Sequence, residues 1–426
     1  MSPIKDHPLR YELANELHAR PFPVLSAPAT AVYLAIKRED DAARRTPEAD
    51  MVHLIDLLDR HGAAHPQPGA THYFGQIGRH QLKWERHTEF VTYTVFTEGL
   101  STRPFDPVDF DVFPADWLDL APGARITSAL IRLSPWQSDE AFSELLRECF
   151  VEESVAVARV LDNAAILAGD FRIDPAGHLR FAVSVMPQTG ARRTGRIIQR
   201  LCEIETYKTM SMLGFARARA LAPEMGRIDE RLGDLIGGLT GGADPAEQAL
   251  EHLLNVTAEL EALVARSSFR MTATMAYDKI VNQRIEVLCE ERFEGRQTFA
   301  EFMMRRFQPA MRTVRSTAAR LSAMAERATR AGHLLRTRVD VERSAQNQEL
   351  LVSMDRRADL QLRLQKTVEG LSVVAISYYA VSLAGYLLYP LSQAAGISKG
   401  LMLAGVTLPV VAGVWWMVRR IRKSVH

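Results

Sequence analysis

Two stretches near the C-terminus decide how this chain is organised: Leu371–Tyr389, LSVVAISYYAVSLAGYLLY, and Gly400–Val418, GLMLAGVTLPVVAGVWWMV. Neither contains a charged residue. Each is close to the roughly 20 apolar residues that a helix needs to cross a bilayer core of about 30 Å. We therefore predict a membrane hairpin. The alternative, a buried hydrophobic hairpin in a soluble protein, is disfavoured because two full-length charge-free runs are rare in soluble cores.

Basic residues flank this hairpin on both sides, whereas the turn between the two runs carries only Lys399. The residues before the first run include Arg356, Arg357, Arg363 and Lys366. The residues after the second run include Arg419, Arg420, Arg422 and Lys423. Positive flanks stay on the cytoplasmic side. We expect a multi-pass protein of the bacterial inner (cytoplasmic) membrane, with both termini in the cytoplasm and a periplasmic turn. Met1–Arg20 is too polar for a signal peptide.

Composition limits the classes of function. The chain has 426 residues and a formal net charge of +1, which gives no electrostatic reason to expect nucleic acid as a partner. Its three cysteines, Cys149, Cys202 and Cys289, are far apart and include no Cys-x-x-Cys pair. We expect no disulfide framework, no metal site and no cofactor.

The first half of the chain predicts a mixed sheet domain. Alternating or β-branched runs predict strands, and helical patterns occur between them. The expected strands are Val32–Ile36, Leu82–Trp84, Val91–Thr97, Ile126–Leu133, Val155–Val160 and Leu179–Val185, the expected helices are Tyr11–Ala19 and Asp50–His61, and Asp106–Gly123 is an expected loop.

After Pro187 the apolar period becomes helical. We expect a glycine-rich break at Gly233–Asp244, a long helix over Ala246–Glu291, and a kink or split at Pro309. From Leu334 to Tyr389 two apolar stripes predict one stalk helix that becomes the first membrane span. The stripes are Leu351, Met354, Ala358 and Leu362, and Leu360, Leu364, Thr367 and Leu371.

The predicted fold class is therefore α+β. The expected segments are an N-terminal cytosolic α/β sheet domain at 1–189, a helical domain at 190–333, a stalk helix at 334–369, transmembrane helix 1 at 370–389, a short periplasmic turn at 390–399, transmembrane helix 2 at 400–418 and a basic cytoplasmic tail at 419–426.

The chain has no phosphate-binding loop, dinucleotide fingerprint, nucleophile elbow or His-Glu-x-x-His motif. The glycine pairs Gly237-Gly238 and Gly241-Gly242 lack a neighbouring lysine, so we interpret them as a linker. Histidines are frequent early in the chain, at His53, His61, His65, His72, His80 and His87. Their spacing favours ordinary hydrogen-bonded histidines over a metal site.

Two polar segments are candidates for a site. The run Trp84–Phe90 holds Glu85, Arg86 and His87, which could bind an anion or form a buried polar network. The alternative is a hairpin turn with cross-strand charge pairs.

The second candidate segment follows Pro187. Arg196, Arg200, Glu203 and Tyr207 are spaced by four, three and four residues, so they share one helix face. This face could be a ligand patch or a subunit contact. The alternative is a solvated or interdomain salt-bridge face.

The order of parts resembles that of the CorA family of divalent-cation channels. The run Leu371–Ile376 and the run Ser382–Tyr386 are similar to the first span of that family in their apolar and small residues. The resemblance implies the fold and a homo-oligomer. It does not carry over magnesium selectivity, because Leu388, Tyr389 and Pro390 occupy the pore mouth where CorA proteins have Gly-Met-Asn.

The full length also resembles an uncharacterised bacterial family of predicted membrane-anchored proteins. The runs Asn15–Phe22, Trp84–Phe90 and Glu203–Tyr207 carry that similarity. The family has no assigned activity, so the resemblance implies no catalytic residues.

Three functions remain open from the sequence. The leading hypothesis is a non-enzymatic, membrane-anchored oligomer whose cytosolic domain binds a ligand or partner. The second is a CorA-like channel with altered selectivity. The third is an enzyme that uses Glu85, Arg86 and His87, which requires these side chains to converge on a concave pocket.

Overall fold

The computed structural model of the chain describes residues 4–16, 22–39, 47–241, 245–394, 396 and 398–425. The described residues form two compact units. The larger unit takes in those of 1–241 and 252–331, and the smaller unit those of 242–251 and 332–426.

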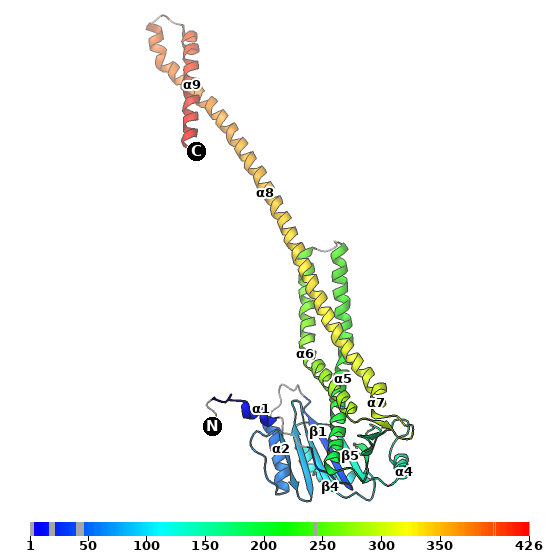
Figure 1. The fold of residues 1–426 in the computed structure, drawn as a ribbon. Coiled ribbons are helices and arrows are strands. Elements are labelled where there is room, and N and C mark those ends of the chain that lie inside the picture. Colours follow the sequence, from blue (N-terminus) through cyan, green and yellow to red (C-terminus); the bar gives the residue numbers. More distant parts are fainter. Residues whose placement is uncertain are drawn as a thin grey trace. The chain divides into compact units, whose positions relative to one another are not determined.

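Strands dominate up to residue 185 and helices after residue 191, so the α+β class is confirmed (Figure 1). The elements are α1 (Arg10–Glu16), β1 (Ala29–Lys37), α2 (Pro47–Arg60), β2 (His72–Ile77), β3 (His80–Arg86), β4 (Phe90–Glu98), the 3₁₀ helix η2 (Pro107–Val112), α3 (Ala115–Asp119), β5 (Ala124–Pro135), α4 (Asp139–Cys149), β6 (Ala156–Val160), β7 (Ala165–Gly169), β8 (Leu179–Val185), α5 (Ala191–Gly241), α6 (Ala246–Glu286), β9 (Glu291–Arg292), α7 (Phe299–Phe302), the π-helix η3 (Met303–Phe307), α8 (Gln308–Ala394) and α9 (Lys399–Val425).

The strands form one sheet in the order β2-β3-β4-β1-β5-β8-β7-β6-β9. Every neighbouring pair is antiparallel except β5 and β8. The six expected strands are present as β1, β3, β4, β5, β6 and β8. The sequence pattern does not predict β2, β7, β9 or helix α4, and the expected loop at Asp106–Gly123 contains η2 and α3. The part of the expected first helix at 17–19 lies outside the described residues.

One face of the sheet carries the hydrophobic core. Because successive side chains on a strand point to opposite faces, Val32 and Leu34 of β1 share this face with Trp84 of β3. They pack against helices α2, α3 and α4, which contribute, among others, Leu57, Trp117 and Phe142.

The opposite face of the sheet is covered by the first half of α5 and is more polar. It carries Tyr33 on β1, Lys83 and Glu85 on β3, and Thr92 and Thr94 on β4. Burying such groups costs free energy unless they find partners or a ligand.

Beyond the sheet, α5, α6 and the first part of α8 pack together within the larger unit. Asp229 of α5 accepts from Arg320 and Arg327 of α8, and Ile228, Leu260 and Leu321 are among the buried apolar residues. The expected break from Gly233 is wrong, because α5 remains helical to Gly241.

The sheet is completed from a distant part of the chain. Helix α6 ends at Glu286 rather than at Glu291, and β9 then pairs with the outer edge of β6. The carboxylate of Glu290 accepts from the backbone N–H groups of Phe299 and Ala300, at 2.9 and 2.8 Å, and so caps the start of α7. The expected disturbance near Pro309 is present as η3, which ends just before α8.

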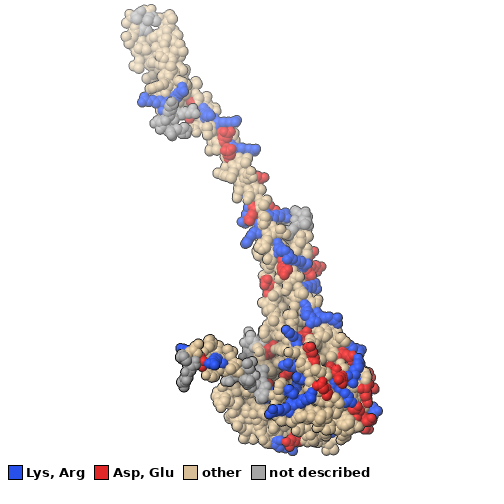
Figure 2. Space-filling view, in the orientation of Figure 1, with Lys and Arg blue, Asp and Glu red and all other residues tan. Residues whose placement is uncertain are grey.

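In the smaller unit, α8 and α9 are long and apolar enough to cross a membrane. Only 11% and 6% of their apolar stretches are buried, unlike a core helix of a soluble protein. Figure 2 shows these stretches without charged side chains. Gly385 of α8 lies 3.8 Å from the side chain of Leu403 of α9, measured from an ideal Cβ position. The turn expected to begin at Pro390 begins later, because Pro390 lies inside α8, which continues to Ala394.

Candidate functional site

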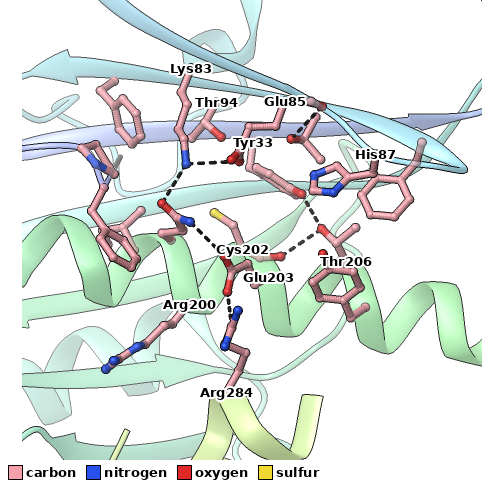
Figure 3. Close-up of a pocket in the computed structure, with 18 of the residues that line it drawn as sticks. Tyr33, Lys83, Glu85, His87, Thr94, Arg200, Cys202, Glu203, Thr206 and Arg284 are labelled. Carbon is pink, nitrogen blue, oxygen red and sulfur yellow. Dashed lines mark hydrogen bonds and ion pairs between the residues drawn. The ribbon is translucent and has the colours of Figure 1, made fainter. Parts of the chain in front are cut away.

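A cavity of about 360 Å³ lies between the polar face of the sheet and α5, wholly within the larger unit (Figure 3). Its volume falls within the range of about 300–1,000 Å³ that is common for small-molecule sites. It is lined by Phe22, Pro23, Tyr33, Lys83, Glu85, His87, Phe90, Thr92, Thr94, Phe96, Ile198, Gln199, Arg200, Cys202, Glu203, Thr206, Tyr207, Arg284 and Val287.

The sheet side of the cavity is built by strand register. Lys83 lies opposite Thr94, and Thr94 lies opposite Tyr33, so the three form one row across β3, β4 and β1. Glu85 and Thr92 form the next row. The Lys83 ammonium is 3.1 Å from a Glu85 carboxylate oxygen.

The helix side presents residues at helical spacing on α5. Lys83 donates to Gln199 Oε1 at 2.7 Å, and Gln199 donates in turn to Glu203 at 2.8 Å. The other Glu203 oxygen accepts from Arg284 of α6. One polar chain therefore joins β3, α5 and α6 across the cavity, as Figure 3 shows.

A second series of hydrogen bonds shows which of two hydroxyl groups donates to the other. The Thr206 hydroxyl donates to the Cys202 carbonyl at 2.9 Å, so it accepts from the hydroxyl of Tyr33, with which it is in contact. Burial raises the pKa of Tyr33 well above its ordinary value. Burial also raises the pKa of the Cys202 thiol, so this side chain stays neutral.

Two lining side chains are less completely paired than their neighbours. Arg200 donates from Nη1 to the Val287 carbonyl at 3.0 Å, and none of the described residues offers it a carboxylate within 4.0 Å. Burial, followed by the nearby cations Arg196 and Arg284, lowers the pKa of Arg200. Thr94 is only 6% exposed, and its hydroxyl has no hydrogen-bond partner among the described residues.

Aromatic rings form another wall. The His87 ring stacks on Phe90, with centroids 4.4 Å apart, and Phe90 meets Tyr207 edge-on at 6.0 Å. Tyr207 stacks on Tyr277 of α6 at 5.4 Å. The cavity thus combines flat apolar surfaces with charged groups.

The segment Phe22–Leu25 crosses the first turns of α5 and adds Phe22 and Pro23 to the cavity wall. Leu25 donates its backbone N–H to Ala191 at 3.1 Å. The segment lies so close to the helix that a Cβ on Gly195 would sit 1.7 Å from the Pro23 carbonyl oxygen. Glycine at 195 is therefore required for this contact.

The two sequence candidates for a site meet at this cavity. Glu85 and His87 line it from β3 and the turn after it, and Arg200, Glu203 and Tyr207 line it from α5. Arg86 does not line it, but lines a neighbouring hollow together with His87 and Tyr207. Arg196 is exposed and does not line the cavity.

Sequence reasoning missed several lining residues. Lys83 shares the parity of Glu85 on β3, and Gln199 lies four residues before Glu203 on α5, so local periodicity could have found both. Tyr33, Thr94 and Arg284 come from β1, β4 and α6, and no local pattern places them here.

The alternative interpretations of the two candidate segments, a hairpin with charge pairs and a salt-bridge face, are confirmed only in part. The expected hairpin between β3 and β4 is confirmed. The two carboxylates of this run pair elsewhere than across the strands: Glu85 pairs with Lys83, two residues away on β3, and Glu89 binds Arg270 and Tyr277 of α6. On α5, Glu203 does form a salt bridge, to Arg284.

Three of the early histidines make ordinary polar contacts. His53 is hydrogen-bonded to the Tyr93 hydroxyl at 2.9 Å and to the Trp117 carbonyl at 3.1 Å. His65 contacts Asp59, and His80 contacts Thr97. Within the described part of the chain, no three His, Cys, Asp or Glu side chains come together as a metal site would require.

The expected pore-mouth residues Leu388, Tyr389 and Pro390 all lie within α8, in the smaller unit. The Lys399 ammonium at the start of α9 is 5.6 Å from the centre of the Tyr389 ring. A lysine at this position brings positive charge to the end of the hairpin.

Comparison with known proteins identifies the family. The model of the family DUF3422, described as protein of unknown function, matches residues 5–425. The chain therefore belongs to this family, as its resemblance to an uncharacterised family predicts. No curated protein and no solved structure matches it. Of the three runs that carry the resemblance, Trp84–Phe90 and Glu203–Tyr207 contribute to the cavity, while residues 17–21 of the first lie outside the described residues.

Proposed function

We propose that this member of the DUF3422 family is a non-enzymatic, membrane-anchored protein whose larger unit binds a small-molecule ligand. We further propose that it belongs to the bacterial inner membrane, with both termini and the larger unit in the cytoplasm, and that it forms a homo-oligomer with a CorA-like order of parts.

The cavity beneath α5 is the observation that carries the ligand-binding proposal. Side chains from β1, β3, β4, α5 and α6 converge on it, and each of these elements contributes at least one polar side chain. Buried polar groups of this kind favour an occupant that completes their hydrogen bonds.

Several features favour binding over catalysis. The carboxylates of Glu85 and Glu203 are already held by Lys83 and Arg284. The pKa of the Cys202 thiol is raised, whereas a nucleophilic cysteine needs a lowered pKa. Of the triad Glu85, Arg86 and His87 that the enzyme hypothesis needs, only the first and last line the cavity.

Exposed apolar side chains support the membrane and oligomer parts of the proposal. On α8, Leu371, Val374 and Leu387 are 66–71% exposed. Before the first apolar run, Leu351 and Leu360 are 65% and 64% exposed, which favours contact with a second copy of the helix.

Small molecules that copurify with the full chain test the ligand-binding proposal. We expect mass spectrometry to find a species with the wild type that is absent from Val287→Trp, which fills the cavity with an indole. The matched control Glu286→Trp places the same side chain on the exposed neighbouring residue and should keep the species. Identical extracts from wild type and Val287→Trp would contradict the proposal.

Thiol labelling tests the membrane topology. We expect Ser398→Cys to react with a membrane-impermeant maleimide in intact spheroplasts, because it lies in the short segment between α8 and α9. The native Cys289 is exposed and should react only after lysis. Labelling of Cys289 in intact spheroplasts, with Ser398→Cys protected, would reverse the topology.

A CorA-like channel of altered selectivity is the second candidate. The length of α8 and the close packing of Gly385 against α9 favour it. Lys399 beside Tyr389 disfavours cation entry. We expect proteoliposomes to show Mg²⁺ and Co²⁺ flux no greater than empty vesicles. Flux well above that background, lowered or altered by Tyr389→Ala, would support the channel instead.

A further inference from the structure

Helix α8 is exposed on all sides over a long stretch before its apolar run. Arg343 contacts Glu247 of α6 at 2.7 Å, and the described residues from 344 to 368 are all exposed. A helix in water draws most of its stability from packing an apolar face against a neighbour. This stretch of α8 therefore presents surface to a partner that a single chain does not supply.

Apolar side chains follow two lines along this stretch. The first face consists of Leu351, Met354, Ala358 and Leu362, and the second face of Leu360, Leu364 and Leu371. Apart from Ala358, these side chains are 55–68% exposed. Successive residues of a helix are about 100° apart, so the centres of the two faces lie about 150° apart around the helix. An apolar stripe about 100° wide serves one packed side, so α8 is suited to a neighbour on each of two sides.

The proposed membrane anchor limits which partner can reach both faces. Helix α8 continues without a break through Leu371–Tyr389 to Ala394. Copies that this run anchors in one bilayer hold residues 350–371 at the same height and in the same direction. A second copy can therefore lie beside the whole length of each face, whereas a soluble partner has no such alignment.

Charged residues at the outer edges of the two faces are complementary. Asp355 and Asp359 lie beside the first face, and Arg356 and Arg363 lie beside the second. When the first face of one copy packs on the second face of a parallel neighbour, the acidic residues of one copy meet the basic residues of the next, as charges beside the seam of a coiled coil do. The residues of opposite sign on these edges, Glu349 and Lys366, lie outside the segment 355–363.

Polar residues also occur on the line between the two faces. Leu350, Arg357, Gln361 and Val368 lie within about 20° of this line, which faces the central axis when copies form a ring. A charged side chain is costly in a closed apolar core but not beside water. Arg357 and Gln361 therefore favour a ring with water along its axis over a compact bundle with an apolar centre.

We infer that residues 350–371 of α8 pack as a closed parallel ring of more than two copies, with the first face of each copy against the second face of the next. A contact between two different faces closes into a ring, whereas a contact of one face with itself makes a dimer. This inference rests on the proposed membrane-anchored homo-oligomer and names its contact surface and arrangement.

Cysteine cross-linking of the full chain in membranes tests the ring. The parent is Cys149→Ser/Cys289→Ser, which keeps only the buried Cys202. Ala358→Cys then reports on the first face, and Leu360→Cys on the second. The reagent is a bismaleimide about 8 Å long, close to the 8–10 Å between the axes of packed helices.

The products distinguish a ring from a dimer. Each single variant should remain without cross-links, because a first face meets a second face rather than another first face. The two single variants expressed together under different tags should give mixed pairs, and both cysteines in one chain should give a ladder of products beyond two chains. The control Val352→Cys is exposed and lies about 100° or more from both face centres, so it should give no product.

The charges at the edges are tested in the chain that carries both cysteines. We expect Arg356→Asp to slow its cross-linking by up to about fivefold, the range for exposed ion pairs. The exchange Asp355→Arg/Arg356→Asp should restore the rate, and high salt should remove the difference. An unchanged rate in Arg356→Asp would overturn the assigned contact between these edges.

The remaining outcomes separate the ring from the proposed homo-oligomer. If Ala358→Cys or Leu360→Cys alone cross-links as readily as the mixed pair, or the ladder stops at two chains, the ring is wrong while the homo-oligomer stands. If no variant cross-links but light scattering of the wild type in mild detergent gives the mass of several chains, the ring is again wrong. If that mass is of one chain, both proposals are wrong.

Discussion

Gly195→Ala should destabilise the protein, although alanine is the better helix former. A Cβ at this position would lie 1.7 Å from the Pro23 carbonyl oxygen, and real Cβ contacts are essentially never under 3.0 Å. The segment Phe22–Leu25 must therefore move by more than an ångström, and the bond from Leu25 to Ala191 is lost with it. Overpacking costs about 1–3 kcal/mol and a hydrogen bond about 1 kcal/mol, whereas helix propensity returns about 1 kcal/mol.

The net loss of unfolding free energy should be about 1–3 kcal/mol, which lowers the melting temperature by roughly 2–6 °C in a unit of this size. Thermal unfolding of the full chain, followed by tryptophan fluorescence, measures this loss. Chymotrypsin should also cleave faster after Leu25, which is 5% exposed in the wild type. The matched control is Gly226→Ala in the same helix, where an added Cβ meets nothing within 4 Å and should stabilise. Equal, positive shifts for both variants would refute the reasoning.

Three further outcomes follow from buried groups. Lys83→Met leaves the carboxylate of Glu85 without its ion pair and should lower the free energy of unfolding by about 3–5 kcal/mol, measured by thermal unfolding. The double variant Lys83→Met/Glu85→Gln should recover most of that loss. A double variant no more stable than the single one would contradict this prediction. Burial lowers the pKa of His53 below its ordinary value of 6.5, so the unfolded chain gains a proton that the folded one resists. Stability should fall as the pH drops below about 6.5, and less steeply in His53→Gln; parallel pH profiles would refute this. The exposed thiol of Cys289 should react with a disulfide reagent in the native protein, whereas the buried thiol of Cys202 should react only after unfolding. Rapid labelling of Cys202 in the native protein would show that it is not buried.

Local periodicity predicted most of the strands and one wall of the cavity. Arg200, Glu203 and Tyr207 could be placed on a common face because helical spacing is a local property. Strand parity would have grouped Glu85 with Lys83 on the cavity face, since alternate residues point to opposite faces of a sheet, whereas His87 follows the end of β3 and depends on the turn. Arg196 fits the helical spacing but is exposed and does not line the cavity, and spacing carries no information on which residues of a helix face reach a cavity.

Long-range features could not be predicted in the same way. Arg284 reaches Glu203 across about eighty residues of sequence, and only the packing of α6 on α5 brings them together. The parallel pairing of β5 with β8 depends on how the intervening strands are ordered. Gly233, Gly237 and Gly238 suggest a break by composition, yet they lie in a helix, because tertiary context can override intrinsic propensity.

The pairing of β9 with β6 has a consequence for synthesis of the protein on the ribosome. Until β9 emerges, the outer edge of β6 offers unpaired backbone groups on which another nascent chain can add a strand. Because β9 follows β6 by about 130 residues and ribosomes add about 5–20 residues per second, that edge stays open for roughly 6–25 s. Aggregation of newly made chains should therefore be greatest in this interval, when a holding chaperone would have the most effect.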